Sequence, residues 1–380
     1  MKMSVEKFCL ISINSFNELT GGGLYLRTLV AFLKKQNLEL TLIDKKNTVI
    51  NFTPTFKEHF SFSKGRIQDV ISRLFLLPSF YMVYLFSIIR ICRLNDIIGL
   101  HNSRLGIICC LLKFLFPKKK FILFTDNFEY HLLQQKKTTI GTVFERILVK
   151  LNEKLGLQFA DLVTYITEHD KQEIERFYRL KKLKSLIIPV VFEKQQNNGF
   201  ESVEFLAKLE LLKCDPRRKF IFTASFDFFP NVQAAKIVLE TATNNRNFIF
   251  VLAGRKLSSL GLKVPDNIYL FEDLTSAEMS SLLSSCDIFY SPLTLGSGMK
   301  TKVAEAISYG LHIYGSRHTM IGYEDIIENS ECVSLINNVA EPLPNHVTQN
   351  VFDKAIIRLI HKKYYSSERF IGNELKILSA

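Results

Sequence analysis

The chain has 380 residues, of which 47% are hydrophobic and 23% are charged, and its net charge is +12. This length predicts two domains, and this composition excludes a disordered, collagen-like or repeat-array protein. The charge is uneven, because the first 190 residues hold 29 basic and 16 acidic side chains and the remaining 190 hold 20 and 21. A basic first half indicates a domain that meets an anionic partner, such as a phospholipid surface, a nucleic acid or a phosphorylated substrate.

The seven cysteines include no CxxC pair, and no Cys/His spacing is typical of a zinc site. Most of them stand in apolar runs, which predicts buried free thiols in a reducing compartment, and we expect a cytoplasmic protein. One apolar segment, Leu74–Ile89, has about 16 residues, whereas a membrane span needs roughly 20. Arginines flank it, and we expect a buried or interface-lying helix there.

Apolar runs of strand length alternate with helical patterns along the chain. In the first half, strands are predicted over residues 8–13, 38–43, 97–100, 121–124 and 162–166, and helices over 24–35, 105–116 and 143–157. In the second half, strands are predicted over 220–223, 248–253, 268–271, 288–291 and 313–315, and helices over 231–243, 277–284, 301–309 and 351–377. This alternation predicts α/β domains with parallel sheets covered by helices on both faces.

Residues 193–219 interrupt the alternation with a polar run and an Asp-Pro pair. We therefore predict a Rossmann-like domain over 1–192, a linker region over 193–219, a second Rossmann-like domain over 220–350, and a helical tail over 351–380 that packs back toward the first domain. Two such domains would face each other across a cleft, and ligands of doubly wound sheets bind outside the carboxyl ends of the strands.

The most informative stretch follows the predicted strand 288–291, where a loop with Gly296 and Gly298 leads into a helix near Lys300. Backbone N–H groups at such a helix start, approached through glycines, favour a phosphate, and the lysine adds positive charge. The alternative is an ordinary strand–loop–helix connection with solvated lysines.

Two further residues on this predicted helix, Thr301 and Glu305, are four positions apart and share a face. A carboxylate placed there can accept hydrogen bonds from ribose hydroxyls. The alternative is that Glu305 pairs with Lys302.

Three stretches in this half, TASFDFFPNVQAA, FVLAGRK and SPLTLGSGMKTKVAEAISYG, follow one another between residues 223 and 310. Taken jointly, they resemble the donor domain of retaining glycosyltransferases of family 4, which have the GT-B fold. The resemblance implies a transferase whose second domain binds a UDP- or GDP-sugar as donor substrate, with no other cofactor. The donor-binding residues that it implies are Ser225, Gly254, Arg255, Gly296, Ser297, Gly298, Lys300, Thr301 and Glu305.

The sequence departs from the family pattern at two places. Ser297 stands where the first Glu of an E-x7-E motif is expected, with Glu305 as the second Glu. The loop after the first strand of this half carries Ser225, Asp227 and Phe228 in place of the usual Arg and Lys. The chain also has no Asp-x-Asp metal motif, in agreement with metal-independent transfer.

The first half resembles the acceptor side of the same enzymes more loosely. The run Gly21, Gly22 and Gly23 resembles their glycine-rich acceptor loop, although a turn at a helix start is the alternative. The segment DIIGLHNS resembles a strand that ends in a histidine, and His101 would then point into the cleft.

A dense polar cluster follows the predicted strand 121–124. The segment FTDNFEYH resembles Thr-x-His-Asn-x-Glu, with Asp126 at the His position and with Asn127 and Glu129 after it. We expect Asn127 to bind the acceptor, and we take Asp126, Glu129 and His101 as catalytic candidates. The alternative is that Asp126 and Asn127 cap the following turn.

The expected activity is hexosyl transfer from a nucleotide-diphosphate sugar to a glycan or lipid-linked glycan, in the biosynthesis of a surface polysaccharide such as lipopolysaccharide or capsule. The resemblance favours retention of configuration. An inverting enzyme would need a carboxylate base, for which Asp126 is the candidate, and an inactive partner subunit is a third alternative. A dehydrogenase would need a G-x-G-x-x-G turn after the first strand, which this sequence lacks.

The basic first half is interpreted as a membrane-facing domain. Lys118, Lys119 and Lys120 follow an apolar run, and arginines flank the apolar segment 74–89. An apolar surface rimmed by basic side chains favours peripheral binding to anionic lipid at the inner face of the cell membrane. The acceptor would then be a polyprenyl-pyrophosphate-linked glycan. Basic residues interleaved with aromatic ones on one face are absent, so we expect no nucleic-acid partner.

Overall fold

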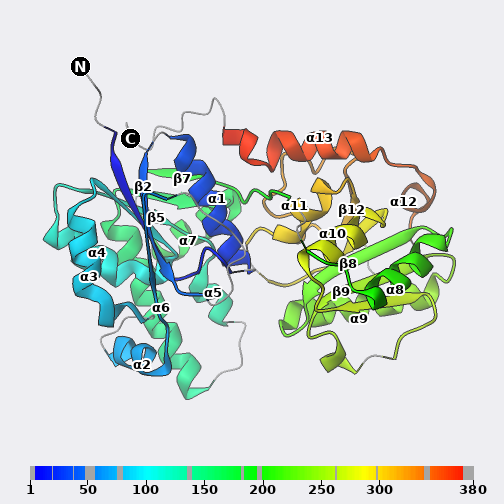
Figure 1. Cartoon of the computed structure of the whole chain (residues 1–380), viewed down its shortest axis with the longest axis horizontal. Coiled ribbons are helices and arrows are strands. Elements are labelled where there is room, and N and C mark those ends of the chain that lie inside the picture. The colour runs from blue at the N-terminus through cyan, green and yellow to red at the C-terminus, as the bar shows by residue number, and fades with distance from the viewer. Residues whose placement is uncertain are drawn as a thin grey trace. The chain divides into compact units, whose positions relative to one another are not determined.

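A computed structural model describes residues 5–18, 20–36, 38–47, 56–74, 80–134, 139–180, 184–194, 199–261, 263–296, 298–337 and 343–370. The chain folds into two compact units, one made of Met1–Val190 with Phe370–Ala380 and the other of Val191–Arg369. Each unit is built on a parallel β-sheet with helices packed on it (Figure 1).

The first unit holds a seven-stranded sheet in the order β3-β2-β1-β4-β5-β6-β7, and its paired strands are all parallel. The strands are β1 (Lys7–Ser12), β2 (Glu39–Lys45), β3 (Glu58–Phe62), β4 (Ile97–His101), β5 (Lys120–Phe124), β6 (Leu162–Tyr165) and β7 (Ser185–Ile187). The helices are α1 (Gly21–Lys35), α2 (Arg66–Leu74), α3 (Leu85–Arg93), α4 (Gly106–Leu115), α5 (Glu129–Gln134), α6 (Ile140–Phe159) and α7 (Glu168–Tyr178), with the short 3₁₀ turns η1 (Phe80–Tyr84) and η2 (Ser103–Leu105).

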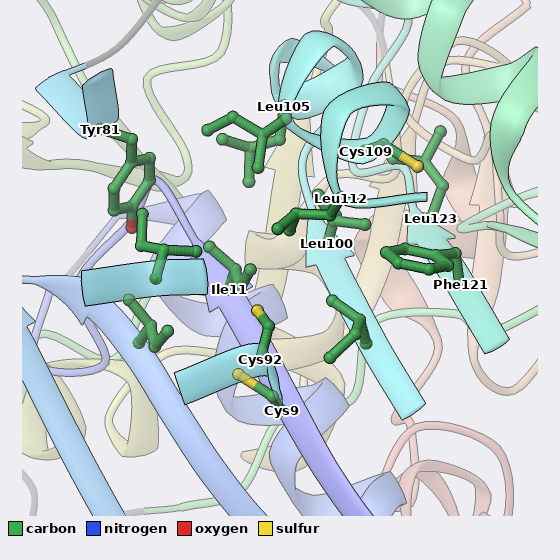
Figure 2. Packing of buried hydrophobic residues seen from close by; sticks show 14 of the residues in the cluster. Cys9, Ile11, Tyr81, Cys92, Leu100, Leu105, Cys109, Leu112, Phe121 and Leu123 are labelled. Atoms are coloured by element: carbon green, nitrogen blue, oxygen red, sulfur yellow. The ribbon is translucent and has the colours of Figure 1, made fainter. Parts of the chain in front are cut away.

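A continuous apolar cluster covers one face of this sheet, with side chains from η1, α3, α4, α6 and α7. Figure 2 shows Cys9 and Ile11 of β1 in this cluster beside Cys92 of α3, with Cys109 of α4 further along the sheet. Five of the seven cysteines are buried and all seven are free thiols, which agrees with the expectation from the sequence. The buried strands carry near-continuous apolar runs because both faces of a parallel sheet are covered.

The second unit holds a six-stranded parallel sheet in the order β10-β9-β8-β11-β12-β13. The strands are β8 (Lys219–Ser225), β9 (Ile249–Arg255), β10 (Ile268–Glu272), β11 (Ile288–Ser291), β12 (His312–Gly315) and β13 (Val333–Leu335). The helices are α8 (Val203–Cys214), α9 (Phe229–Asn244), α10 (Ser276–Ser284), α11 (Thr301–Ser308), α12 (Asn345–Gln349) and α13 (Lys354–Tyr364), with the 3₁₀ turns η3 (Ser258–Leu260) and η4 (Ser367–Phe370).

Strand order reverses once in each sheet, between β1 and β4 in the first unit and between β8 and β11 in the second. The connections that leave the two strands at such a point run in opposite directions, which opens a crevice at the carboxyl edge of the sheet. At the first reversal, Ser12 and His101 are register partners at the ends of β1 and β4. At the second, β8 ends at Ser225 and β11 at Ser291.

All ten strands predicted from the sequence are present within two residues of their predicted bounds. The strands that sequence reasoning missed, β3, β7 and β13, are short edge or near-edge strands. The sequence of β3, EHFSF, is mostly exposed and has no continuous apolar run that would predict it.

Three helical expectations need correction. The helix expected at residues 24–35 begins at Gly21, because the Thr20 hydroxyl accepts a hydrogen bond from Gly23 N–H and caps it there. The tail is not one helix over 351–377, since α13 ends at Tyr364, η4 follows, and residues 371–377 lie outside the described part. In the described part of the segment 74–89, the 3₁₀ turn η1 precedes α3, so residues 80–89 do not form one α-helix, and residues 75–79 lie outside the described part.

Within the described ranges, no helix combines the length and the apolar character that crossing a membrane requires. The tail helix α13 packs against α11 of the second unit, and Phe370, which follows it, contacts Phe32 of α1 with ring centroids 5.2 Å apart.

Candidate functional site

Two polar regions lie at the carboxyl edges of the two sheets, and the first is deeply buried. His101, the last residue of β4, has no exposed surface, and burial lowers its pKa to about 3, so its imidazole is neutral. Its Nδ1 lies 2.7 Å from Ser12 Oγ. Its Nε2 has no hydrogen-bond partner among the described residues and lies 3.9 Å from Asp126 Oδ2.

Asp126 follows β5 and is 6% exposed. Its Oδ1 accepts a hydrogen bond of 2.7 Å from Asn102 Nδ2. Burial, and then the nearby charge of Glu129, raise the pKa of Asp126 to about 7, while the hydrogen bond from Asn102 acts in the opposite direction. A carboxyl group with a pKa near neutrality can take up and release a proton at physiological pH, as a general base or acid must.

Glu129 is the first residue of α5, and its two oxygens have different partners. Oε1 accepts from Asn102 Nδ2 at 3.1 Å, and Oε2 accepts from Arg104 Nε at 2.8 Å. Arg104 also contacts Glu145 of α6 at 3.2 Å. Burial alone would lower the pKa of Arg104, but these two carboxylates outweigh it and raise that pKa. The guanidinium therefore stays charged and neutralises its two acidic neighbours.

A third buried carboxylate, Glu153 of α6, holds neighbouring groups of this network in place by hydrogen bonds. It accepts hydrogen bonds from the Ser103 hydroxyl at 2.9 Å, the Glu129 N–H at 2.9 Å, the Tyr130 N–H at 3.1 Å and the Tyr178 hydroxyl at 2.8 Å. Burial raises the pKa of Glu153 to about 7 despite these donors. Glu153 thus fixes the start of α5 and, through it, the place of the Glu129 side chain.

The three catalytic candidates from the sequence, His101, Asp126 and Glu129, are brought together here. Asn127 is half-buried beside them in the chain. The acceptor-loop candidates Gly21, Gly22 and Gly23 instead form the first turn of α1. A β-carbon at position 23 would lie 2.2 Å from the Glu18 carbonyl oxygen, so close packing against the backbone requires glycine there, whereas one at position 22 would lie 2.5 Å from Asn14 Nδ2 and would displace that side chain.

Sequence reasoning missed Asn102, Arg104 and Glu153, on which the network depends. Asn102 and Arg104 follow His101 directly in the segment HNSR, where polar residues after a buried strand were the available signal. Glu153 was detectable as a carboxylate inside the apolar pattern of the helix predicted over 143–157.

The second polar region lies at the start of α11. Gly296 and Gly298 adopt φ angles of 107° and 69°, which side chains disfavour, and Ser297 between them lies outside the described residues. Lys300 is the N-cap residue and makes no side-chain capping hydrogen bond. Its Nζ donates to the Gly298 carbonyl at 2.7 Å, which places a cation beside the first N–H groups of the helix.

Tyr323 holds this turn in place from the neighbouring loop. Its hydroxyl donates to the Lys300 carbonyl at 2.7 Å and accepts from the Ala304 N–H at 3.0 Å. The helix therefore starts at a fixed position, with Thr301 as its first residue. A helix start of this kind, with a lysine at its N-cap, suits an anion.

Glu305 stands one turn into α11, and its Oε2 lies 2.5 Å from Lys302 Nζ. Its side chain is only 13% exposed. The pairing with Lys302 that the sequence left open as an alternative is therefore present. For Glu305 to accept hydrogen bonds from a ribose, its carboxylate would use its other oxygen or exchange this partner.

The remaining donor candidates lie on the neighbouring strands. Ser225 and Arg255 are register partners at the ends of β8 and β9. Gly254 has a φ of 149°, and a β-carbon on it would lie 1.7 Å from the Ala224 carbonyl oxygen, so the two strands could not approach each other with any other residue there. Ser225 Oγ donates to Asp227 at 2.7 Å and helps to lower the pKa of that exposed carboxylate.

No family model matches this sequence, and no curated protein matches it. Solved structures do match over nearly the whole chain. HepE of Anabaena in complex with UDP and glucose is 12% identical with a TM-score of 0.65, and the match covers 96% of this chain and 97% of that one. Sucrose-phosphate synthase of Thermosynechococcus elongatus is 14% identical with a TM-score of 0.66 and 96% coverage of both chains. WaaG, a glycosyltransferase involved in lipopolysaccharide biosynthesis, is 13% identical with a TM-score of 0.59, and covers 97% of this chain and 96% of that one.

The chain has the GT-B fold. The prediction of an α/β protein with two Rossmann-like domains is confirmed, while identities of 12–14% speak for the fold alone. Both polar regions lie at strand-order reversals of this GT-B chain. In the described part of the chain, no group of three or more His, Cys, Asp or Glu side chains is arranged to hold a metal ion.

Replacing Asp126 by Asn is expected to stabilise the protein at pH 8 and to change little at pH 4.5. The fold raises the pKa of Asp126 from the unfolded value near 3.9 to about 7. The folded protein therefore binds this proton more tightly than the unfolded chain does, and the protein loses stability as the pH rises from about 4 to about 7. An amide carries no charge to desolvate and can donate to His101 Nε2. Urea denaturation at both pH values should show a gain on the order of 4 kcal/mol at pH 8, since each pKa unit corresponds to about 1.4 kcal/mol.

The matched control for this substitution is Asp44→Asn. Asp44 is equally buried and accepts hydrogen bonds from the Phe16 N–H at 2.8 Å and the Ser61 hydroxyl at 2.6 Å, so its loss should destabilise the fold at both pH values. Equal stability changes at pH 4.5 and pH 8 for Asp126→Asn would contradict the expectation.

Proposed function

We propose that this protein is a glycosyltransferase that moves a sugar from a nucleotide-diphosphate sugar to a glycan or lipid-linked glycan acceptor. The observation that carries the proposal is the start of α11, where positive-φ glycines and Lys300 surround a helix N-terminus at a strand-order reversal. Support also comes from the proteins of the same fold, because HepE was solved with UDP and glucose and WaaG is a glycosyltransferase of lipopolysaccharide biosynthesis. A role in surface polysaccharide biosynthesis is part of the proposal.

The donor half of the mechanism requires a stable leaving group. The bond from the anomeric carbon to the diphosphate breaks, and negative charge develops on the diphosphate oxygen. The N–H groups of the first turn of α11 and the Nζ of Lys300 would receive that charge, with Arg255 as a second cation at the end of β9. Thr301 and Glu305 would meet the sugar or the ribose. The proposed donor is a UDP- or GDP-sugar, used without any other cofactor.

Nucleotide binding tests the donor site. In EDTA, UDP or GDP at about 100 times its dissociation constant should stabilise the protein by about 2.7 kcal/mol, whereas CMP, AMP and NAD should not. The Lys300→Ala variant should lose most of this shift, because it removes a charge-assisted hydrogen bond to phosphate. Differential scanning calorimetry measures the effect. Lys213→Ala, an exposed lysine of α8, is the control and should keep the full shift. The absence of a shift with any diphosphate would count against the donor site and favour an inactive partner subunit.

The acceptor half of the mechanism is proposed for the buried network of the first unit. An acceptor hydroxyl must lose its proton as it attacks the anomeric carbon. In the retaining reaction that we favour, the leaving phosphate takes this proton, and Asp126 only orients the hydroxyl. In the inverting alternative, Asp126 itself takes it, and the pKa of about 7 suits that task.

The anomeric configuration of the newly formed product separates these reactions. Proton NMR during the first turnovers should show the configuration of the donor if transfer is retaining. In that case Asp126→Asn should lower the rate only modestly. Inversion, together with a loss of about 100-fold or more in Asp126→Asn, would replace the retaining proposal with the inverting one. Diphosphate binding without any transfer would instead support the inactive-subunit alternative.

A peripheral position on an anionic membrane, at the cytoplasmic face, is also proposed for the first unit. Lys119 Nζ donates to the backbone oxygens of Arg93 and Asn95, which ties the end of α3 to the segment after α4. The exposed faces of these two helices carry large apolar and basic side chains, which we call the basic–apolar patch: Phe86, Arg90, Arg93, Leu94, Leu111, Phe114, Leu115 and Lys118. Phe86 and Phe114 are 88% and 87% exposed, and aromatic rings beside cations suit the headgroup region of an anionic bilayer. A polyprenyl-pyrophosphate-linked glycan would be reached there.

Vesicle binding tests the basic–apolar patch. The protein should sediment with phosphatidylglycerol vesicles at low salt, less at high salt, and poorly with phosphatidylcholine alone. Phe114→Asp should weaken the binding by about ten-fold or more, since it removes buried apolar area and adds a repulsive charge. Phe200→Asp is the matched control, because Phe200 is 95% exposed but lies in the second unit. Equal losses in both variants would rule out a role specific to this patch.

A further inference from the structure

Asn102 holds a backbone conformation that a residue with a side chain seldom adopts. Its φ is 89° and its ψ is 131°, outside the regions that L-residues favour. Such a conformation costs free energy and persists only where the surroundings over-determine it. Here the Asn102 N–H donates to the Phe124 carbonyl at 2.8 Å, and the Leu105 N–H donates to the Asn102 carbonyl at 3.1 Å. The backbone is thus held between β5 and η2.

The side-chain amide of Asn102 is fixed as firmly as its backbone. Oδ1 accepts the Arg104 N–H at 2.9 Å, so the oxygen must face η2 and the nitrogen must face the other way. Nδ2 then places its two hydrogens on two different carboxylates, Asp126 at 2.7 Å and Glu129 at 3.1 Å. One amide bridges both acids.

The two carboxylates that Asn102 bridges differ in what else neutralises them. Glu129 has the guanidinium of Arg104 on its second oxygen at 2.8 Å. In the described part of the chain, Asp126 forms no ion pair with a lysine or arginine, and its second oxygen faces the unpartnered Nε2 of neutral His101. The amide of Asn102 is therefore the main group that favours the charged form of Asp126.

Groups from every neighbouring element bear on this balance. The titratable and charged side chains around Asp126 and its contacts are Tyr25 of α1, His101 of β4, Arg104 of η2, Glu129 of α5, Glu145 and Glu153 of α6, and Asp170 and Tyr178 of α7. Arg104 is the only cation in this set, and Glu129 and Glu145 already engage it. No other side chain of the set can take over the task of Asn102.

We propose that Asn102 is the positioning residue that holds Asp126 in its ionised form, with Oδ1 engaged and Oδ2 left to receive the acceptor hydroxyl. This inference rests on the proposed function, in which Asp126 meets the acceptor. It applies to both stereochemical outcomes, because a base must be ionised, and a carboxylate that only orients a hydroxyl accepts its hydrogen bond most strongly in the ionised form. The strained backbone is then the cost of placing the amide between the two acids.

The Asn102→Gly variant removes the amide without adding strain, because glycine adopts a φ of 89° freely. Losing a hydrogen bond to a charged acceptor should raise the pKa of Asp126 by about one unit. The wild-type kcat/KM for the acceptor should rise with pH through about 7. In Asn102→Gly this rise should move up by about one pH unit, so that the rate falls about five-fold at pH 7 and recovers at pH 9.

Two further variants separate positioning from a merely structural role. Asn95→Ala removes another buried asparagine of the first unit, whose Nδ2 donates to the Ile91 carbonyl at 3.0 Å, and should lower stability without moving the pH profile. In the Asp126→Asn background, Asn102→Gly should cause no further shift. An Asn102→Gly profile that is lower but unshifted, or a shift that persists without Asp126, would overturn the proposal.

A readout that needs no activity keeps this proposal distinct from the proposed function. Asp126 and Glu153 both contribute to the loss of stability of the wild type between about pH 4 and pH 7. The contribution of Asp126 should extend to about pH 8 in Asn102→Gly and be absent in the Asp126→Asn double variant, which should keep the contribution of Glu153 alone. If no nucleotide sugar is transferred at all, the proposed function fails, and the catalytic meaning of Asn102 fails with it. A stability profile that Asn102→Gly leaves unshifted refutes the inference even in an active enzyme.

Discussion

Three buried carboxylates gather near the carboxyl edge of the first sheet, and only one of them, Glu129, forms an ion pair with the guanidinium of Arg104. Asp126, Glu129 and Glu153 are all less than 10% exposed, and Arg104 is the cation among them. Charges taken out of water must be paired or hydrogen-bonded, or their pKa values shift until they are neutral. Glu129 is paired, while Asp126 and Glu153 are balanced between the two forms near pH 7. Buried carboxyl groups with raised pKa values lower the stability of the folded protein at neutral pH. A region that contains them despite this cost is a candidate functional site.

The candidate site of the second unit contains cations near the surface in place of a cluster of buried carboxylates. Its candidate site relies on backbone N–H groups and on lysines and arginines near the surface, with no comparable buried acid cluster among the residues proposed for the donor. Glycine is required where backbone approaches backbone, as at Gly254, and where the chain turns with positive φ before α11. Such a region can receive a large, highly charged and exchangeable ligand without leaving a buried charge behind when the ligand departs. In the proposed function, the first unit by contrast meets a single hydroxyl group of the acceptor.

The fold could be predicted well from the sequence because the strands of a parallel sheet form recognisable apolar runs in the chain. Ten strands were found from apolar runs, since burial on both faces leaves little room for polar residues. Strand β3 escaped because it is an exposed edge strand, and α1 was expected to start too late because Thr20 and three glycines form its first turn. The grouping of His101 with Asp126 was also predictable, because the ends of parallel strands meet at one edge of a sheet.

What the sequence did not reveal were the residues that set the chemistry of those groups. Asn102 acts through a φ angle and an amide orientation, neither of which leaves a mark in a single sequence. Glu153 reaches Glu129 from 24 positions along the chain, through a helix whose packing decides which side chains point inward. Types of residue at strand ends can be read directly, but the pKa of Asp126 depends on partners that only the folded chain brings within hydrogen-bonding distance. Burial and the charge of Glu129 favour the neutral form of Asp126, and the amide of Asn102 opposes them, so the charge of this carboxyl group responds strongly to small changes around it.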